Sequence, residues 1–332
     1  MEPLLQVSEL EVQFGTYAGV VKAVRGVDFK VFPGEVVAIV GESGCGKSVT
    51  AQTIMRLIPS PPGKITGGSV QFNGEEIFEK SERQMRKVRG NTIGMIFQDP
   101  MTFLNPVLNI STQVTENLRL HKGMSIHQAR DRAVELFNLV GIPDPKLRLK
   151  QYPYQFSGGM RQRVMIAMAI ACDPKLLIAD EPTTALDVTI QAQILELLKE
   201  IKERLDTAII LITHDLGVVA GLADRVLVMY AGQIVETGTI DEIFSTPAHP
   251  YTWGLLKSIP RLNMKKGQKL TPIWGQPPDL LSLLATCPFL PRCDYGMEIC
   301  TREMPEPFGR NLVKCWLKHP QAPHVQYNRE VS

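Results

Sequence analysis

Three short apolar runs along the chain predict buried strands. They cover residues Val36–Val40, Leu176–Ala179 and Ala208–Ile212, and none alternates between apolar and polar positions. Continuous apolar runs are typical of strands that helices cover on both faces, as in parallel sheets. The pattern therefore predicts an α/β domain built around a parallel sheet.

Between the second and third runs the apolar positions take up a helical period. Glu and Lys occupy the opposite face, and the apolar positions are Ile190, Ile194, Leu197, Leu198, Ile201 and Leu205. This spacing predicts an amphipathic helix that links two parallel strands. A second packed helix is predicted over Val49–Ile58, where Pro59 would end it.

Two regions depart from the strand–helix alternation. Residues from about 105 to 165 are charged and helix-forming and contain no buried-strand run, so we expect an inserted helical subdomain. Beyond about residue 245, prolines recur and favour extended connections and short elements. We therefore predict a main domain over residues 1–245 and a C-terminal extension over 246–332.

Composition and charge limit the kinds of partner that the chain is expected to bind. The chain has 332 residues and a formal net charge of only +2, which gives no global electrostatic reason to bind nucleic acid. The start lacks the basic and apolar layout of a secretory signal. No apolar run approaches the roughly 20 residues needed to span a bilayer. We expect a cytoplasmic protein.

The segment Gly41–Ser48 fits the phosphate-loop pattern G-x-x-x-x-G-K-[ST] and lies between a predicted strand and a predicted helix. Its backbone N–H groups would surround the phosphates, Lys47 would reach them, and Ser48 would bind Mg²⁺. A glycine-rich turn without this role is the alternative, which the flanking elements disfavour. The predicted nucleotide contacts here are Gly41, Ser43, Gly44, Cys45, Gly46, Lys47, Ser48 and Val49.

Two carboxylates follow the apolar run Leu176–Ala179. Burying a charge is unfavourable in free energy unless the charge has a partner, and a bound metal ion is such a partner. Asp180 would hold Mg²⁺, and Glu181 would act as general base toward the attacking water. The alternative is simple solvation at the end of a strand.

The octapeptide FSGGMRQR, which begins at Phe156, resembles the LSGGQ signature of ABC ATPases. Gln98 resembles the Q-loop glutamine of that family, and His214 resembles its switch histidine. Ala185-Leu186-Asp187 resembles the D-loop, again in the family's order. Taken singly, Gln98 would more often be a surface amide and His214 a structural histidine.

The resemblance implies that nucleotide lies between two ATPase domains. Ser157, Gly158 and Gly159 of one domain would then contact the γ-phosphate held by the other, and Asp187 would lie at the same interface. It also implies that Gln98 joins Asp180 and Ser48 at Mg²⁺, and that His214 assists hydrolysis. Tyr17 is the expected adenine-stacking aromatic, with Phe14 as competitor and a core position as the alternative for Tyr17.

Several stretches make the resemblance narrower. Met160 stands where the signature has its final Gln, a form similar to that of OppD/DppD subunits of peptide importers, and the stretch 97–106 is similar to them as well. The segment 249–278 looks like the C-terminal extension of peptide and nickel importer ATPases. This resemblance implies an α/β P-loop NTPase (RecA-like) core with an antiparallel β portion.

The same resemblance implies partners that the chain does not contain. These are a second OppF/DppF-like ATPase, two transmembrane permeases and, indirectly, an extracytoplasmic peptide-binding protein, with the chain at the cytoplasmic face of the membrane. Nickel and glutathione remain alternative cargoes. Alternatives of another class are a soluble ABC ATPase acting on DNA or ribosomes, and an iron–sulfur sensor that uses ATP as a switch.

Four cysteines gather near the end of the sequence with the spacing C-x5-C-x6-C-x14-C: Cys287, Cys293, Cys300 and Cys315. In a reducing compartment such a group favours metal over disulfides. Structural zinc usually shows tighter pairs, and cubane clusters accept looser spacing. We therefore expect a [4Fe–4S] cluster that fastens the extension, with zinc as the alternative and four free thiols as the third interpretation.

Overall fold

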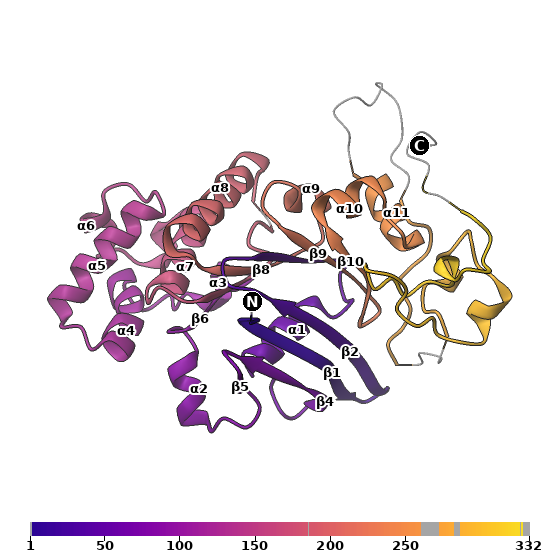
Figure 1. Cartoon of the computed structure of the whole chain (residues 1–332). Helices are drawn as coiled ribbons and strands as arrows, with labels where there is room; N and C mark the ends of the chain where they lie inside the picture. Colours follow the sequence, from indigo (N-terminus) through magenta and orange to yellow (C-terminus); the bar gives the residue numbers. More distant parts are fainter. Residues whose placement is uncertain (1, 185, 260–271, 282–285, 326, 328–332) are drawn as a thin grey trace. The chain divides into compact units, whose positions relative to one another are not determined.

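The computed structural model describes residues 2–184, 186–259, 272–281, 286–325 and 327 (Figure 1). The chain forms two compact units. The first unit contains residues 1–4, 31–36 and 73–212, and the second contains 5–30, 37–72 and 213–332. The phosphate loop thus belongs to the second unit, whereas Asp180 and Glu181 belong to the first.

Three parallel strands form the sheet of the first unit: β6 (Ile93–Ile96), β7 (Leu176–Asp180) and β8 (Ala208–Thr213). Ile93 pairs with Leu176, and Leu176 pairs with Ala208, so the strands start in step. Every residue of the three strands is buried. The predicted parallel sheet is confirmed, because strands covered on both faces need apolar side chains throughout.

Most of the remaining elements of the first unit are helices. The crossover helix α8 (Val188–Leu205) buries four of the six apolar positions that its pattern predicted, Ile194, Leu197, Leu198 and Ile201, whereas Ile190 and Leu205 are half-buried. Between β6 and β7 the described chain is helical and contains no strand. The remaining elements of this unit are β5 (Glu75–Glu76), α2 (Glu82–Val88), α3 (Pro100–Phe103), α4 (Ile110–Lys122), α5 (Ile126–Leu139), α6 (Pro145–Arg148), the 3-10 turn η1 (Pro153–Gln155) and α7 (Gly158–Ile170).

The second unit combines antiparallel and parallel strands. Strand β1 (Leu5–Thr16) lies between β2 (Gly19–Val31) and β4 (Gly63–Phe72), and it pairs with β4 in antiparallel fashion. Strand β3 (Val36–Val40) pairs in parallel with β9 (Arg225–Tyr230), which pairs antiparallel with β10 (Gln233–Thr239). The helical elements are α1 (Lys47–Ile54), α9 (Leu216–Val219), α10 (Ile240–Ser245), α11 (Pro250–Lys257), η2 (Leu290–Arg292), η3 (Glu298–Thr301) and η4 (Trp316–Lys318).

Helix α1 is shorter than the sequence predicted. It begins at Lys47 and ends at Ile54, instead of running to Ile58. Arg56 adopts a left-handed conformation with φ of 50°, and the N–H of Leu57 donates to the carbonyl of Gln52 over 2.8 Å. This is a helix stop of the Schellman type, which usually carries glycine where this chain has arginine. The prediction was wrong because Pro59 was taken as the stop signal.

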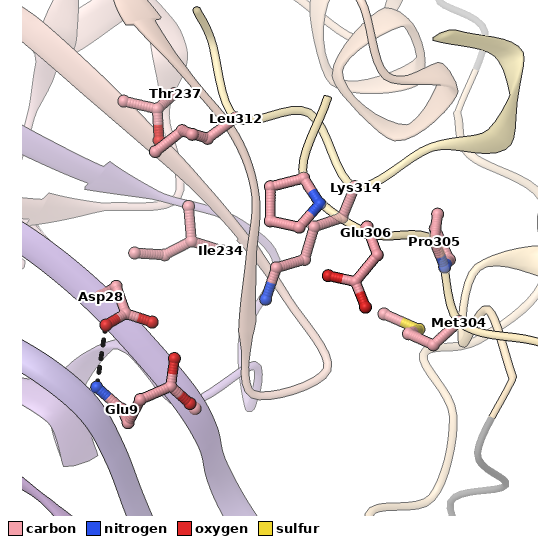
Figure 2. Close-up of a pocket in the computed structure, with 11 residues that line it drawn as sticks. Glu9, Asp28, Ile234, Thr237, Met304, Pro305, Glu306, Leu312 and Lys314 are labelled. Atoms are coloured by element: carbon pink, nitrogen blue, oxygen red, sulfur yellow. Dashed lines mark hydrogen bonds between the residues drawn. The ribbon is translucent and has the colours of Figure 1, made fainter. Parts of the chain in front are cut away.

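The C-terminal residues of the second unit pack on β10. The N–H of Lys314 donates to Val235 and the N–H of Thr237 donates to Asn311, each over 2.9 Å. This unit contains a cavity of about 300 Å³. Figure 2 shows that Glu9 and Asp28 face Lys314 there. Within the described ranges, no helix is both long and apolar enough to cross a membrane.

Candidate functional site

The phosphate loop Gly41–Ser48 connects β3 to α1, as predicted. Two of its glycines are required by space and by backbone conformation. A Cβ on Gly41 would lie 2.2 Å from the carbonyl oxygen of Met229, and one on Gly46 would lie 2.4 Å from that of Ala23. Both have φ values in the left-handed region, 156° and 106°, which favours glycine. The local sequence therefore dictates the tight turn.

Lys47 is buried at the start of α1, with 4% of its surface exposed. Its ammonium donates to the carbonyl oxygens of Gly41 and Glu42 over 2.8 and 3.0 Å, which places the charge inside the loop. Ser43 and Gly44 are exposed at the tip, whereas Cys45 is buried. Burial raises the pKa of the Cys45 thiol, so this side chain is a packed neutral group. A helix N-terminus with a lysine and no acidic residue in the first turn attracts phosphate.

Gln98 and Glu181 come together in the first unit. Gln98 follows β6 and Glu181 follows β7, and because these strands are parallel neighbours their carboxyl ends meet at one edge. Gln98 Nε2 donates to Glu181 Oε2 over 2.9 Å. Asp180 and Glu181 are both buried, with 3% and 8% exposed. Buried carboxylates at a strand end fit a catalytic or metal-binding role better than simple solvation.

Thr184 is a neighbour of Glu181 that the sequence analysis missed. Its hydroxyl donates to Oε2 of Glu181 over 2.9 Å, so this oxygen accepts two hydrogen bonds. Glu181 itself has a left-handed φ of 45°, and its N–H donates to the carbonyl of Ile212 over 2.9 Å. The Glu181 carboxylate is therefore held in one orientation. A hydroxyl three residues after an acidic residue in a turn was the available signal.

The signature serine begins helix α7. Ser157 is the N-cap, and its Oγ accepts a hydrogen bond from the N–H of Met160 over 3.3 Å. Ser157 and Gly158 are exposed, whereas Phe156 is buried with 3% exposure. The phenylalanine that stands in place of the signature's leucine therefore packs in the core. The exposed start of a helix, with N–H groups pointing outward, suits contact with an anion.

Asp187, His214 and Tyr17 are the remaining predicted residues. Asp187 is the N-cap of α8 and accepts from the N–H of Ile190 over 3.0 Å, while Ala185 lies outside the described residues. His214 follows β8 and is exposed. Tyr17 is fully exposed in the turn between β1 and β2, which excludes the core position considered for it. An exposed aromatic ring remains available for stacking.

Comparisons with known proteins identify the family. The family model described as "ABC transporter" matches residues 24–184. The family model described as "Oligopeptide/dipeptide transporter, C-terminal region" matches residues 235–300. The oligopeptide transport ATP-binding protein OppD of Bacillus subtilis is 58% identical over 97% of this chain and 91% of its own length. The chain belongs to the OppD/DppD family of ABC transporter ATP-binding proteins. The dipeptide transport ATP-binding protein DppD of the same organism is 57% identical over 98% of both chains.

A solved structure supports the fold of the OppD/DppD-type chain. The dimeric structure of a post-hydrolysis state of the ATP-binding cassette MJ0796, bound to ADP and Pi, covers 71% of this chain and 98% of that one. The TM-score is 0.64 at 28% identity. The prediction of an ABC-type P-loop NTPase core is thereby confirmed.

All four C-terminal cysteines of this OppD/DppD-type chain line one small pocket: Cys287, Cys293, Cys300 and Cys315. None of these four cysteines forms a disulfide bond. Burial raises the pKa of Cys293 to about 11 and that of Cys315 to about 12.

The expected metal-binding extension is not supported by the geometry. Among the described residues, no three or more His, Cys, Asp or Glu side chains form a group that could hold a metal ion. The donor chemistry fits a soft metal, whereas the positions of the thiols do not form such a site. Sequence spacing alone could not reveal this, because it does not determine how loop-borne thiols are oriented.

Contacts between the phosphate loop and the C-terminal extension were not predicted from the sequence. The N–H of Glu42 donates to the Tyr251 hydroxyl on α11 over 2.8 Å, across 209 positions of sequence. Tyr251 is buried among Tyr230 and Phe289, at centroid distances of 4.5 and 5.4 Å. No local pattern announces such a contact, since it depends on the fold.

Proposed function

We propose that this chain hydrolyses ATP to ADP and phosphate and thereby powers an ABC importer of dipeptides or oligopeptides. The observation that carries the proposal is similarity over nearly the whole length, including the extension, to oligopeptide and dipeptide transport ATP-binding proteins. A soluble ABC ATPase or an iron–sulfur sensor would not require the transporter-type C-terminal region.

The residues of the site divide the work of hydrolysis. The N–H groups of the phosphate loop and the Lys47 ammonium bind the β- and γ-phosphates. Ser48, Gln98 and Asp180 supply the oxygen ligands that Mg²⁺ prefers, and this ion would neutralise phosphate charge. Glu181 accepts a proton from the attacking water, and Gln98 and Thr184 hold its carboxylate. His214 assists at the γ-phosphate, and Tyr17 stacks on adenine.

The proposal includes a shared site in a dimer. Ser157, Gly158 and Gly159 contact the γ-phosphate bound to the partner ATPase, and Asp187 lies at the same interface. Support comes from the exposed helix start at Ser157 and from the dimeric cassette with the same fold. The partners are an OppF/DppF-like ATPase and two permeases, with a peptide-binding protein acting through them. The chain then lies at the cytoplasmic face of the membrane.

The four cysteines carry a separate part of the proposal. We assign them a [4Fe–4S] cluster, with zinc as the alternative, that fastens the extension without taking part in hydrolysis. Support comes from the convergence of all four thiols on one pocket. Binding requires the thiols to lose protons.

The decisive experiment reconstitutes the complete importer in lipid vesicles. ATPase turnover should rise when the binding protein carries a dipeptide or an oligopeptide, and labelled peptide should accumulate on one side. Stimulation by a nickel chelate or by glutathione, without a response to peptides, would assign the alternative cargo. ATP hydrolysis that is independent of the permeases and of every cargo would contradict the transport function.

A further inference from the structure

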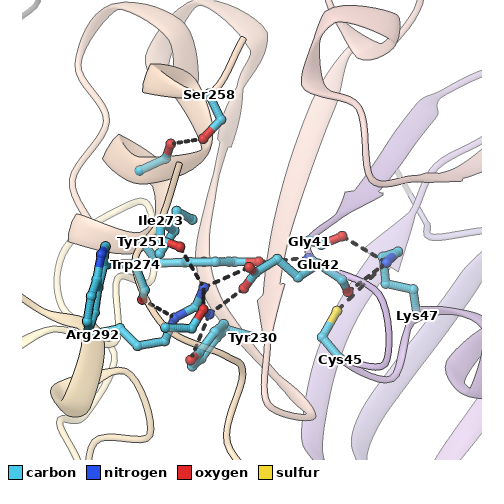
Figure 3. Close-up of polar contacts among 12 residues, drawn as sticks. Gly41, Glu42, Cys45, Lys47, Tyr230, Tyr251, Ser258, Ile273, Trp274 and Arg292 are labelled. Carbon is cyan, nitrogen blue, oxygen red and sulfur yellow. Dashed lines mark hydrogen bonds and ion pairs between the residues drawn. The ribbon is translucent and has the colours of Figure 1, made fainter. Parts of the chain in front are cut away.

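A partly buried ion pair joins the C-terminal extension to the phosphate loop. Arg292 donates from Nη1 and Nη2 to the two carboxylate oxygens of Glu42 over 2.6 and 2.8 Å (Figure 3). Glu42 is the second residue of the phosphate loop, and Arg292 lies in η2, immediately before Cys293. The side chain of Arg292 is 4% exposed and that of Glu42 is 26% exposed.

The arginine is fixed by further contacts on its own side. Its Nε donates to the carbonyl of Trp274 over 3.0 Å, and Nη2 also lies within hydrogen-bond distance of the Ile273 and Gly275 carbonyls. Its Nη1 also reaches the Tyr230 hydroxyl at 3.3 Å. A planar guanidinium with this many acceptors has one available orientation. Arg292 thus makes a bidentate hydrogen-bonded contact with the loop from a fixed orientation.

Glu42 is held at two points as a result. Its carboxylate is bound by Arg292 and its backbone N–H by the Tyr251 hydroxyl. Its carbonyl accepts from Lys47, the proposed phosphate-binding lysine. A displacement of Glu42 would therefore also move an acceptor of the Lys47 ammonium. In addition, an unpaired carboxylate in a loop that binds a polyanion would repel the nucleotide, and Arg292 neutralises this charge.

We infer that Arg292 is a positioning residue for ATP binding: it neutralises Glu42 and holds the phosphate loop in the conformation that receives the nucleotide. Through this residue the cysteine-bearing extension becomes part of the nucleotide site. The inference rests on the proposed phosphate-binding role of Gly41–Ser48. It goes beyond that role, because it makes ATP affinity depend on a side chain about 250 positions away.

The test is a double-mutant cycle measured as ATP affinity of the purified full chain by calorimetric titration. Arg292→Ala should weaken ATP binding about tenfold, since it leaves the Glu42 carboxylate unpaired beside the phosphates. In a Glu42→Gln background the same change should cost less than about twofold, because the charge that Arg292 neutralises is gone. A merely structural role of Arg292 would give the same loss in both backgrounds.

Controls separate the possible failures. Arg302→Ala removes an exposed arginine of the same extension, paired with Glu298, and should leave ATP affinity unchanged. If Arg292→Ala does not fold, Arg292→Gln serves in the same cycle, since it removes the charge and keeps an amide that can still donate hydrogen bonds. Equal losses in both backgrounds, or no loss at all, would overturn the inference. If Lys47→Ala leaves ATP binding intact, the phosphate-loop assignment itself fails.

Discussion

Gln98 Nε2 donates a hydrogen bond to Glu181 Oε2 over 2.9 Å, although the two residues are 83 positions apart in the chain. Each residue follows a strand of the parallel sheet, and the pairing of β6 with β7 brings them together. A glutamine that contacts both the proposed base and the proposed Mg²⁺ would link the two parts of the reaction. Gln98 and Glu181 thus form a connected pair within the first unit.

Glu181→Gln should leave ATP binding intact and lower turnover of the assembled complex about 100-fold or more. The change removes the proposed base and keeps the side-chain size and Asp180, and general-base catalysis contributes about 10²–10⁴-fold. Steady-state hydrolysis and ATP titration on the same preparation measure both effects. Turnover close to that of the wild type would contradict the assignment of Glu181 as the general base.

Thr184→Val should lower turnover about tenfold with little change in ATP affinity. Valine has nearly the same shape, but it cannot donate to Glu181 Oε2, and a hydrogen bond to a charged group is worth about 1.5–3 kcal/mol. Thr102→Val is the matched control, because the Thr102 hydroxyl donates to Asp99 instead. An unchanged rate in Thr184→Val would contradict the role of Thr184 in orienting the base.

Ser157→Arg should disable the nucleotide site built on the partner's phosphate loop. The exposed N-cap of α7 would then carry a bulky cation in place of the hydroxyl that contacts the γ-phosphate. The measurement places Ser157→Arg and Glu181→Gln on the same or on opposite ATPase subunits of one complex. If Ser157→Arg affects only the site that contains its own Lys47, the shared-site mechanism is wrong.

Cys300→Ala should abolish the uptake of iron and sulfide by the extension in anaerobic reconstitution. Elemental analysis and the visible absorption of the purified chain report the cluster directly, without a measurement of activity. Cys172→Ala is the matched control, since this buried thiol lies in the first unit. Zinc without iron would favour the alternative metal. A wild-type chain that takes up neither metal would leave four free thiols as the correct interpretation.

The sequence by itself determined the elements that carry the chemistry. Continuous apolar runs predicted β3, β7 and β8, because a strand buried on both faces admits no polar position. The glycines of the phosphate loop and the N-cap at Ser157 are local features, which neighbouring residues specify. For this reason the loop, the carboxylates and the signature could be located without a structure.

Only the tertiary structure decided which of these residues meet. The bonds of Glu181 to Gln98 and of Glu42 to Arg292 join residues that are distant in sequence, so no local propensity records them. The end of α1 at Ile54 depended on a left-handed arginine, which sequence statistics disfavour. The four cysteines show the same limit. Their spacing is a property of the sequence, whereas the directions of their thiols depend on how the packed extension folds.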